Sequence, residues 1–174
     1  MGRLAGKKAV VLGAASKDNM GQTIARLFAR EGAEVMVAGR KEEPLKALAA
    51  EIGGHYALCD ITKRAEVRAL ADAAVAKMGR VDAAINASGW GLLASLVDTT
   101  EEQLDQIVDL QFKGVHHFLQ AFVEKMIAQQ PSGGSLISIS SATTRAVTMK
   151  SPSMRRPAKC AASSPASRTC AATT

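Results

Sequence analysis

Two glycines, Gly13 and Gly21, flank a polar turn that lies between a short apolar run and an amphipathic stretch. A strand that ends in such a turn and continues as a helix leaves free backbone N–H groups at the positive end of the helix dipole, where a phosphate binds well. Glycines in the turn also let a pyrophosphate approach the backbone. The turn is therefore a candidate dinucleotide-binding loop, and the alternative is a tight strand-to-helix connection without a ligand.

The second candidate is Arg40, which follows the next apolar run, and the first acidic residue after that run is Glu42. At this point of a dinucleotide-binding fold, an acidic residue holds the ribose 2′-OH of NAD, whereas an arginine accommodates the 2′-phosphate of NADP. Arg40 therefore favours NADP(H) over NAD(H), and Lys17 inside the turn favours it too. The alternative for Arg40 is a solvated loop charge.

Alternating elements must position these residues. Apolar runs predict strands at residues 9–12, 34–38, 56–59, 81–85 and 136–139. Amphipathic stretches predict helices at residues 21–30, 45–52, 66–78 and 100–129, with Thr62 as the N-cap of the third. This order predicts an α/β fold with a doubly wound parallel sheet of the Rossmann type, truncated to about five strands, whose ligands bind beyond the carboxyl ends of the strands. Four of the candidate residues fall at such ends: Gly13, Arg40, Asp60 and Asn86.

Residues 5–144 resemble the short-chain dehydrogenase/reductase family. Four motifs carry the resemblance in chain order: Gly13…Asn19-Met20-Gly21, Asp60-Ile61, Asn86-Ala87-Ser88-Gly89, and the run from Gly134 to Ser141. In that family they are the glycine motif, the adenine contact, the Asn-Ala-Gly motif and a strand that ends on the catalytic serine. The resemblance implies these cofactor-binding residues: Gly13, Ser16, Lys17, Asn19, Met20, Gly21, Arg40, Asp60, Ile61, Asn86, Ala87 and Gly89.

The glycine loop departs from the family's common pattern. It is two residues longer, like the loops of the enoyl-reductase branch, and Asn19 stands where the middle glycine is expected. Asparagine adopts a positive φ more readily than most residues, so we expect Asn19 to preserve the turn.

For catalysis, the resemblance implies that Ser141 binds the substrate carbonyl, that Gln111 replaces a water-holding asparagine, and that Lys159 is the lysine of a Tyr-x-x-x-Lys motif. The tyrosine of that motif, the usual acid/base, is missing. Four residues before Lys159 stands Arg155, which stays protonated and is a poor acid/base. The sole tyrosine of the chain is Tyr56, far upstream.

The last thirty residues differ from the rest. All of the formal net charge of +6 comes from residues 145–174, which contain six Lys and Arg, no acid, and no Leu, Ile, Phe, Trp or Tyr. A segment of this composition cannot bury enough apolar surface to offset the conformational entropy that it would lose on folding. We therefore predict two parts, a dinucleotide-binding domain at residues 1–144 and a low-complexity basic tail at residues 145–174. The abrupt change favours a frameshift, truncation or sequence error near residues 145–155, and the alternative is a natural tail.

Composition also limits location and partners. The sequence contains no run of about twenty apolar residues and no signal-peptide pattern, and its three cysteines lack the spacing of a metal site, so we expect a cytoplasmic protein without metal or membrane partners. The long helix at 100–129 is apolar on several faces, which predicts that it is buried on several faces, one of them against the sheet. The resemblance implies that another face forms the interface of a homo-oligomer, and the alternative is a partner helix within the same chain.

Three functions remain open. The first is an NADP(H)-dependent oxidoreductase of a small carbonyl or alcohol substrate, with doubtful activity in this chain. The second is a non-catalytic NADP(H)-binding protein. The third, a binder of nucleic acid or another anionic surface through the basic tail, is the least favoured.

Overall fold

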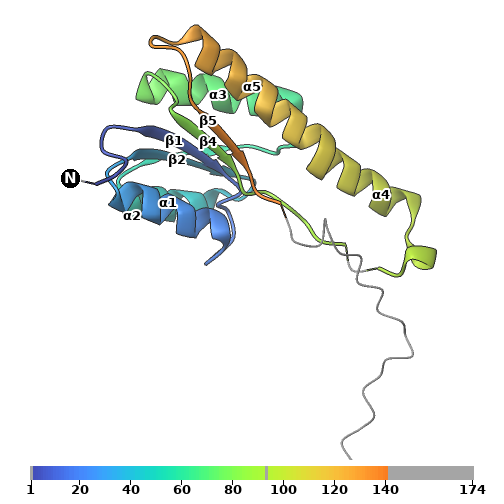
Figure 1. Ribbon diagram of the computed structural model, residues 1–174. Helices are drawn as coiled ribbons and strands as arrows, with labels where there is room; N and C mark the ends of the chain where they lie inside the picture. Colours follow the sequence, from blue (N-terminus) through green and yellow to red (C-terminus); the bar gives the residue numbers. More distant parts are fainter. Residues whose placement is uncertain (1, 93, 141–174) are drawn as a thin grey trace, which may run out of the picture. The chain divides into compact units, whose positions relative to one another are not determined.

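The computed structural model describes residues 2–92 and 94–140 (Figure 1). Within them, five parallel strands form one sheet in the order β3-β2-β1-β4-β5. The strands are β1 (Lys8–Leu12), β2 (Glu34–Gly39), β3 (His55–Leu58), β4 (Ala83–Asn86) and β5 (Ser135–Ser138). The helices are α1 (Met20–Arg30), α2 (Glu42–Ile52), α3 (Arg64–Met78), α4 (Glu101–Val108) and α5 (Gly114–Ala128). The predicted α/β fold with a doubly wound five-stranded sheet is confirmed.

The centre of the sheet is β1, which pairs with β2 on one side and β4 on the other; Val10, for example, lies between Met36 and Ala84. Residues 9–12 of β1 are buried. A parallel sheet is covered on both faces, so its central strands are apolar throughout and do not alternate with polar residues. This explains why a continuous apolar run marks β1 in the sequence.

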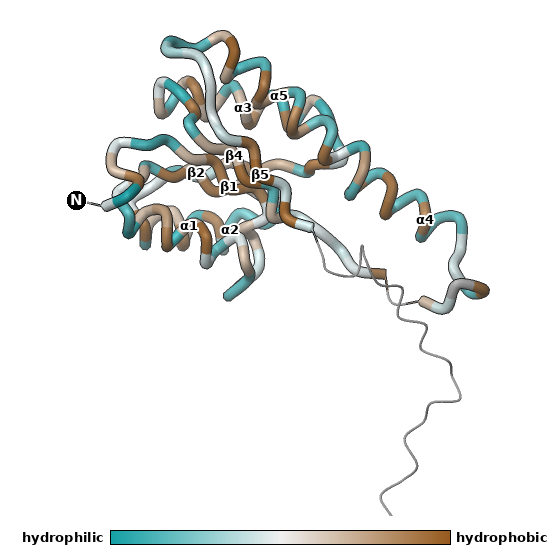
Figure 2. The backbone as a smooth tube through the Cα atoms, viewed as in Figure 1, coloured by the Kyte–Doolittle hydropathy of each residue, from teal (hydrophilic) through white to brown (hydrophobic). Residues whose placement is uncertain are grey.

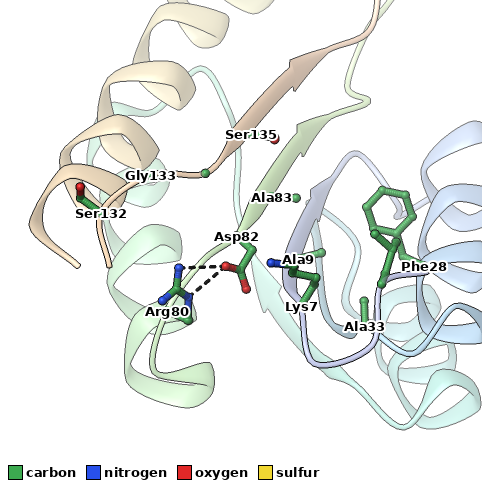
Figure 3. A pocket seen from close by; sticks show the side chains of 12 residues that line it. Lys7, Ala9, Phe28, Ala33, Arg80, Asp82, Ala83, Ser132, Gly133 and Ser135 are labelled. Carbon is green, nitrogen blue, oxygen red and sulfur yellow. Dashed lines mark hydrogen bonds and ion pairs between the residues drawn. The ribbon is translucent and has the colours of Figure 1, made fainter. Parts of the chain in front are cut away.

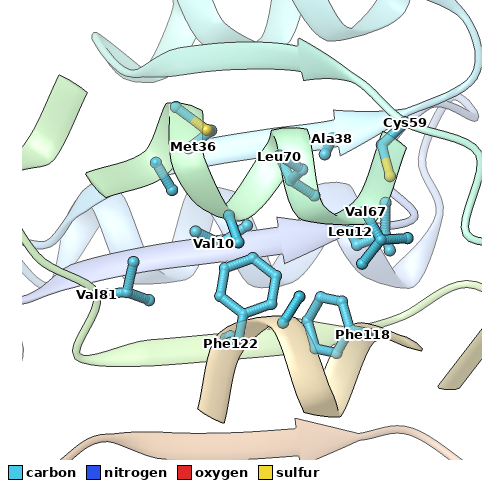
Figure 4. Close-up of a cluster of buried hydrophobic side chains, with 14 of the residues drawn as sticks. Val10, Leu12, Met36, Ala38, Cys59, Val67, Leu70, Val81, Phe118 and Phe122 are labelled. Atoms are coloured by element: carbon cyan, nitrogen blue, oxygen red, sulfur yellow. The ribbon is translucent and has the colours of Figure 1, made fainter. Parts of the chain in front are cut away.

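Helices α3 and α5 cover one face of the sheet, where the larger apolar cluster lies (Figure 4). Phe118 and Phe122 of α5 are both fully buried, and their ring centroids are 4.7 Å apart. They lie against Val10 of β1 and Leu70 of α3. This cluster fixes α5 on the sheet.

Helices α1 and α2 cover the opposite face (Figure 1). Val11, Val35 and Val37 of the sheet are fully buried there against Leu45 and Leu48 of α2. The two apolar clusters hold the strands between two helical layers. The carboxyl ends of all the strands therefore lie at fixed positions along one side of the sheet, called the carboxyl edge here, and their amino ends lie along the opposite side.

Two predicted helix starts are wrong. The second helix begins at Glu42, before Pro44, because a proline in the first turn lacks only an N–H that the helix does not use. The third begins at Arg64 with Lys63 at its N-cap position. Thr62 is not the N-cap, because its hydroxyl donates instead to Asp60 Oδ1, 2.8 Å away.

The predicted helix at residues 100–129 is helical along its length but contains a wider turn. Thr100 closes a capping box with Gln103 at the start of α4, and a π-helical turn over Asp109–Lys113 joins α4 to α5. Such turns insert an extra residue into a helix and change the direction of the side chains they carry. Among the described residues, no helix is both long and apolar enough to span a membrane.

Candidate dinucleotide site

A recess of about 250 Å³ lies at the carboxyl edge of the sheet. Eight of the predicted cofactor-binding residues line it: Gly13, Ser16, Asn19, Arg40, Asp60, Ile61, Ala87 and Gly89. Four others do not line it themselves but lie within two residues of one that does: Lys17, Met20, Gly21 and Asn86. The recess therefore brings together residues from the ends of β1, β2 and β4 and from the segment after β3.

Close backbone packing explains the two loop glycines. Gly13 has φ +99°, and a Cβ placed on it would lie 2.5 Å from the carbonyl carbon of Ala87 and from the nitrogen of Ser88. A Cβ on Gly21 would lie 2.7 Å from the carbonyl oxygen of Gly13. Neither position has room for a side chain, so the start of α1 packs directly on the end of β1.

Asn19 has a different role from the expected one. Its φ is −82°, so it does not supply the positive φ of a middle glycine; Asp18, with φ +53°, is the residue in that conformation. Asn19 is the N-cap of α1: its Oδ1 accepts a hydrogen bond from the backbone N–H of Gln22 at 2.9 Å. Its Nδ2 donates to the Gly13 carbonyl at 2.6 Å. The expectation of a positive φ at Asn19 was wrong, because capping the helix requires an extended backbone.

Gln22 is a loop-positioning residue that the sequence analysis missed. Its side chain is buried, its Nε2 donates to the Ala14 carbonyl at 3.2 Å, and its Oε1 accepts from the Asp18 N–H at 3.2 Å. A buried amide bonded at both ends fixes the two sides of the loop. One signal in the sequence could have indicated this role: Gln22 is a polar residue on the face of α1 that also carries Gly21 and Ala25, and that face is buried.

Arg40 and Asp60 also line the recess. Arg40 is exposed and directly follows β2. Partial burial favours the neutral form of Asp60, but hydrogen bonds from Thr62 and the charges of Arg40 and Lys63 outweigh it and lower the pKa of the Asp60 carboxyl. Asp60 is therefore ionised near neutral pH. The guanidinium of Arg40, which is exposed, places a positive charge at the rim of the recess.

Asn86 organises the turn after β4. It is buried, and its Oδ1 accepts from the Ser88 N–H at 3.0 Å and from the Ser88 hydroxyl at 2.5 Å. The Ala87 N–H continues the sheet by donating to the Leu12 carbonyl at 2.8 Å. Ser88, the extra residue of the Asn-Ala-Gly motif, is thus tied to Asn86, and the turn stays tight beside Gly13.

Gln111 lies in the π turn, and its Nε2 donates to the carbonyl of Trp90. Trp90 lines the recess, so Gln111 connects the helical segment to the recess wall. Of the other two predicted catalytic residues, Ser141 and Lys159, both lie outside the described residues. Tyr56 does not line the recess; it is in β3, and its hydroxyl donates to Glu42 at 3.1 Å.

Cys59 forms part of the recess floor and is 2 % exposed. Burial, with smaller contributions from Glu66 and Asp60, raises the pKa of its thiol to about 12. Since the thiolate is the reactive form, we expect Cys59 to react with a disulfide reagent at least about a hundredfold more slowly than a free thiol until the chain unfolds. Reaction rates measured with and without urea, in a chain carrying Cys160→Ser and Cys170→Ser, check this. A fast reaction in the native chain would contradict it.

A second recess lies at the opposite edge of the sheet, where the strands begin (Figure 3). Arg80 Nε donates to Asp82 Oδ1 at 3.0 Å, and the same guanidinium donates to the carbonyls of Gln130 and Pro131. Asp82 Oδ2 also accepts from the Lys8 N–H at 2.9 Å. These hydrogen bonds connect the segment before β4 to the loop before β5. We therefore assign these side chains a structural role and not a binding one.

The carboxyl-edge recess fits a dinucleotide. The first backbone N–H groups of α1 have no partner within the helix, and the Asn19 side chain caps the N–H of Gln22, leaving those of Met20 and Gly21 to a ligand. Gly13 and Gly21 let the loop pack closely against neighbouring backbone, which fixes the position of these N–H groups. The free N–H groups at the start of α1 suit a pyrophosphate.

Comparison with known proteins agrees with this geometry. Residues 13–173 match the family model described as enoyl-(acyl carrier protein) reductase. The chain is 36 % identical over 149 residues to the oxidoreductase UcpA of Salmonella typhimurium, covering 82 % of this chain and 54 % of that protein. It is 33 % identical over 144 residues to a D-threitol dehydrogenase of Mycolicibacterium smegmatis, covering 80 % and 54 %.

Comparison with solved structures points to the same family. A short-chain type dehydrogenase/reductase from Mycobacterium marinum superposes with a TM-score of 0.77 at 29 % identity, covering 84 % of this chain and 60 % of that one. The chain spans little more than half the length of the curated relatives it matches. Members of the family use NAD(P) cofactors. By its family model, its relatives and its fold, the chain belongs to the short-chain dehydrogenase/reductase family of oxidoreductases.

Proposed function

We propose that the chain binds a nicotinamide dinucleotide in the carboxyl-edge recess, and that the whole protein transfers hydride between NADP(H) and a small carbonyl or alcohol substrate. One observation carries the proposal: the recess joins the capped start of α1, the tight contact of Gly13 with the Ala87–Ser88 backbone, and Arg40. The cofactor supplies the hydride when bound. The residues of this chain bind and orient it, and a cytoplasmic location remains our expectation.

The preference for NADP(H) rests on charge at the end of β2. Arg40 follows Gly39, the last residue of β2, and lines the recess. Glu42, the nearest acid after it, lies in the first turn of α2 and accepts a hydrogen bond from the Tyr56 hydroxyl, so its carboxylate is engaged elsewhere. A 2′-phosphate beside Arg40 would gain a charge-assisted hydrogen bond, whereas a 2′-OH would gain a weaker one.

We expect Arg40→Asp to weaken NADPH binding by about tenfold to a hundredfold, because it removes a charged hydrogen bond and adds a like charge. NADH binding should weaken much less or improve. Nicotinamide fluorescence titrations of both cofactors measure the ratio. The control is Arg30→Asp at the exposed end of α1, which changes the net charge equally but lies away from the recess. Equal losses in both variants would contradict the role of Arg40.

A second candidate function is dinucleotide binding without turnover. The only tyrosine, Tyr56, lies in β3 with its hydroxyl on Glu42 and does not line the recess. The proposed machinery would then consist of Ser141 and Lys159 without a tyrosine acid/base, and Gln111 would act by holding the Trp90 carbonyl. Saturable NADPH binding with no carbonyl reduction over a panel of ketones would favour this candidate over the oxidoreductase.

We also propose that copies associate through the helical segment of residues 100–129. Leu104 is 55 % exposed and Phe112 is 75 % exposed, and they lie about two helical turns apart in that segment. Large apolar side chains exposed on one helical segment are candidates for an interaction surface. Sedimentation of Phe112→Asp against the unchanged chain tests this contact.

A further inference from the structure

The chain leaves the sheet directly after β3, at the segment that lines the recess with Asp60 and Ile61. The Cys59 N–H still donates to the Gly39 carbonyl of β2, at 2.9 Å. The N–H of Asp60 instead donates to a side chain, that of Glu66, whose Oε2 is 2.8 Å away. A residue six positions further along the chain, in the first turn of α3, therefore holds the backbone of Asp60 in place.

Glu66 is the third residue of α3, a position from which a glutamate usually bonds the backbone N–H of the N-cap residue. Here the N-cap residue is Lys63, and its N–H already donates to the Asp60 carbonyl at 3.0 Å. Helix α3 is amphipathic (Figure 2), and Glu66 is half-buried beside Val67 and Leu70, which face the sheet. With the N–H of the N-cap taken, the Glu66 carboxylate reaches past it to the Asp60 N–H.

The second oxygen of Glu66, Oε1, accepts a hydrogen bond from Lys63 Nζ at 2.9 Å. The Lys63 side chain is 64 % exposed, so we expect this ion pair to contribute little. The hydrogen bonds from Lys63 and from the Asp60 N–H lower the pKa of the Glu66 carboxyl, so Glu66 is ionised near neutral pH. The Asp60 N–H therefore donates to a carboxylate, which makes its hydrogen bond a charge-assisted one.

Other contacts fix the neighbouring atoms of this segment. Asp60 Oδ1 accepts from the Thr62 N–H at 3.0 Å and from the Thr62 hydroxyl. Ile61 is buried, and a Cβ placed on Gly114 of α5 would lie 3.1 Å from the Ile61 carbonyl oxygen, so α5 packs closely on it. Removing the Glu66 side chain would loosen the Asp60 peptide, whereas these other contacts would keep the surrounding fold.

We propose that Glu66 is a positioning residue for the adenine half of the dinucleotide, because it accepts the Asp60 N–H and so fixes the segment Asp60–Ile61 where that half binds. The inference rests on the proposed function. Asp60 and Arg40 both line the recess, and the end of β2 meets the adenosine ribose in dinucleotide-binding folds, so this segment lies on the adenine side. Glu66 does not line the recess and acts through Asp60.

Binding of NADPH and of 2′-phospho-ADP-ribose, which lacks the nicotinamide, tests this role in the full chain. We expect Glu66→Ala to weaken both by about tenfold, because the Asp60 N–H loses its acceptor. Glu66→Gln keeps an acceptor oxygen and should bind both within about threefold of the unchanged chain. The matched control is Glu43→Ala, which removes an acid from the first turn of α2, away from the recess, and should change neither affinity. Equal losses in Glu43→Ala and Glu66→Ala, or a loss for NADPH alone, would overturn the proposal.

Amide hydrogen exchange, followed by NMR, measures the same hydrogen bond without a cofactor. We expect the Asp60 N–H to exchange at least about tenfold faster in Glu66→Ala than in the unchanged chain, and Glu66→Gln to restore its protection. The Leu70 N–H, inside α3, should be equally protected in all three chains and verifies that they are folded. An Asp60 N–H that stays protected in folded Glu66→Ala would overturn the proposal. A chain that shows the expected exchange but binds neither ligand would contradict the proposed function, and the role of Glu66 in binding would fail with it.

Discussion

Replacing Gly13 with alanine is expected to lower the free energy of unfolding by about 2–5 kcal/mol and to abolish dinucleotide binding. Gly13 has φ +99°, where an L side chain is strained. Its new Cβ would also lie 2.5 Å from the Ala87 and Ser88 backbone, so the turn after β4 would have to move. Both walls of the recess would shift. Urea unfolding followed by circular dichroism, together with NADPH fluorescence, measures the two effects.

The control for this substitution is Gly53→Ala. Gly53 ends α2 with φ +63°, but no atom outside its chain neighbours lies within 4 Å of an added Cβ. The strain of φ alone costs about 1–2 kcal/mol and leaves the recess unchanged. Equal destabilisation by the two substitutions, or full NADPH binding by Gly13→Ala, would show that the close approach of β1 to the turn after β4 is not required.

Replacing Phe122 with alanine is expected to destabilise the chain by about 3–5 kcal/mol. The ring is fully buried between α5 and the sheet and packs on Phe118 at 4.7 Å between centroids (Figure 4). Removing it leaves a cavity in a layer that cannot collapse, because the β-strands and α3 hold the remaining walls. Chemical denaturation measures the change in the midpoint and in the free energy of unfolding.

The matched control is Phe112→Ala, in the same helical segment. Phe112 is 75 % exposed, so its removal should change the free energy of unfolding by less than about 0.5 kcal/mol in a dilute sample. A large loss at Phe112 together with a small loss at Phe122 would mean that the packing of α5 against the sheet has been assigned to the wrong face.

Pattern and spacing were enough to predict the sheet. The continuous apolar runs at β1 and β2, and the small residues after each strand, indicated a parallel sheet with ligands at its carboxyl edge, and the strand order agrees. Gly13, Arg40 and Asp60 could be placed at that edge because strand ends in a parallel sheet coincide. Local sequence is sufficient to predict the fold where the same strand–helix unit repeats along the chain.

Contacts between distant segments were not accessible to the same reasoning. Nothing in the sequence around Asn19 separates a residue with positive φ from an N-cap, since asparagine suits both. Gln129 is a second case: its side chain bonds the N–H and C=O of Val81, at 3.0 and 2.9 Å, across 48 residues. The π turn that directs Gln111 to Trp90 likewise depends on packing and not on helical periodicity.

The most direct test of the dinucleotide site is a titration of the full chain with NADPH and with NADH, followed by nicotinamide fluorescence. We expect saturable binding of NADPH that is at least about tenfold tighter than that of NADH, because Arg40 gains a charged partner only with the 2′-phosphate. Failure of a folded chain to bind either cofactor would contradict the assignment of the recess, and tighter binding of NADH would contradict the role of Arg40.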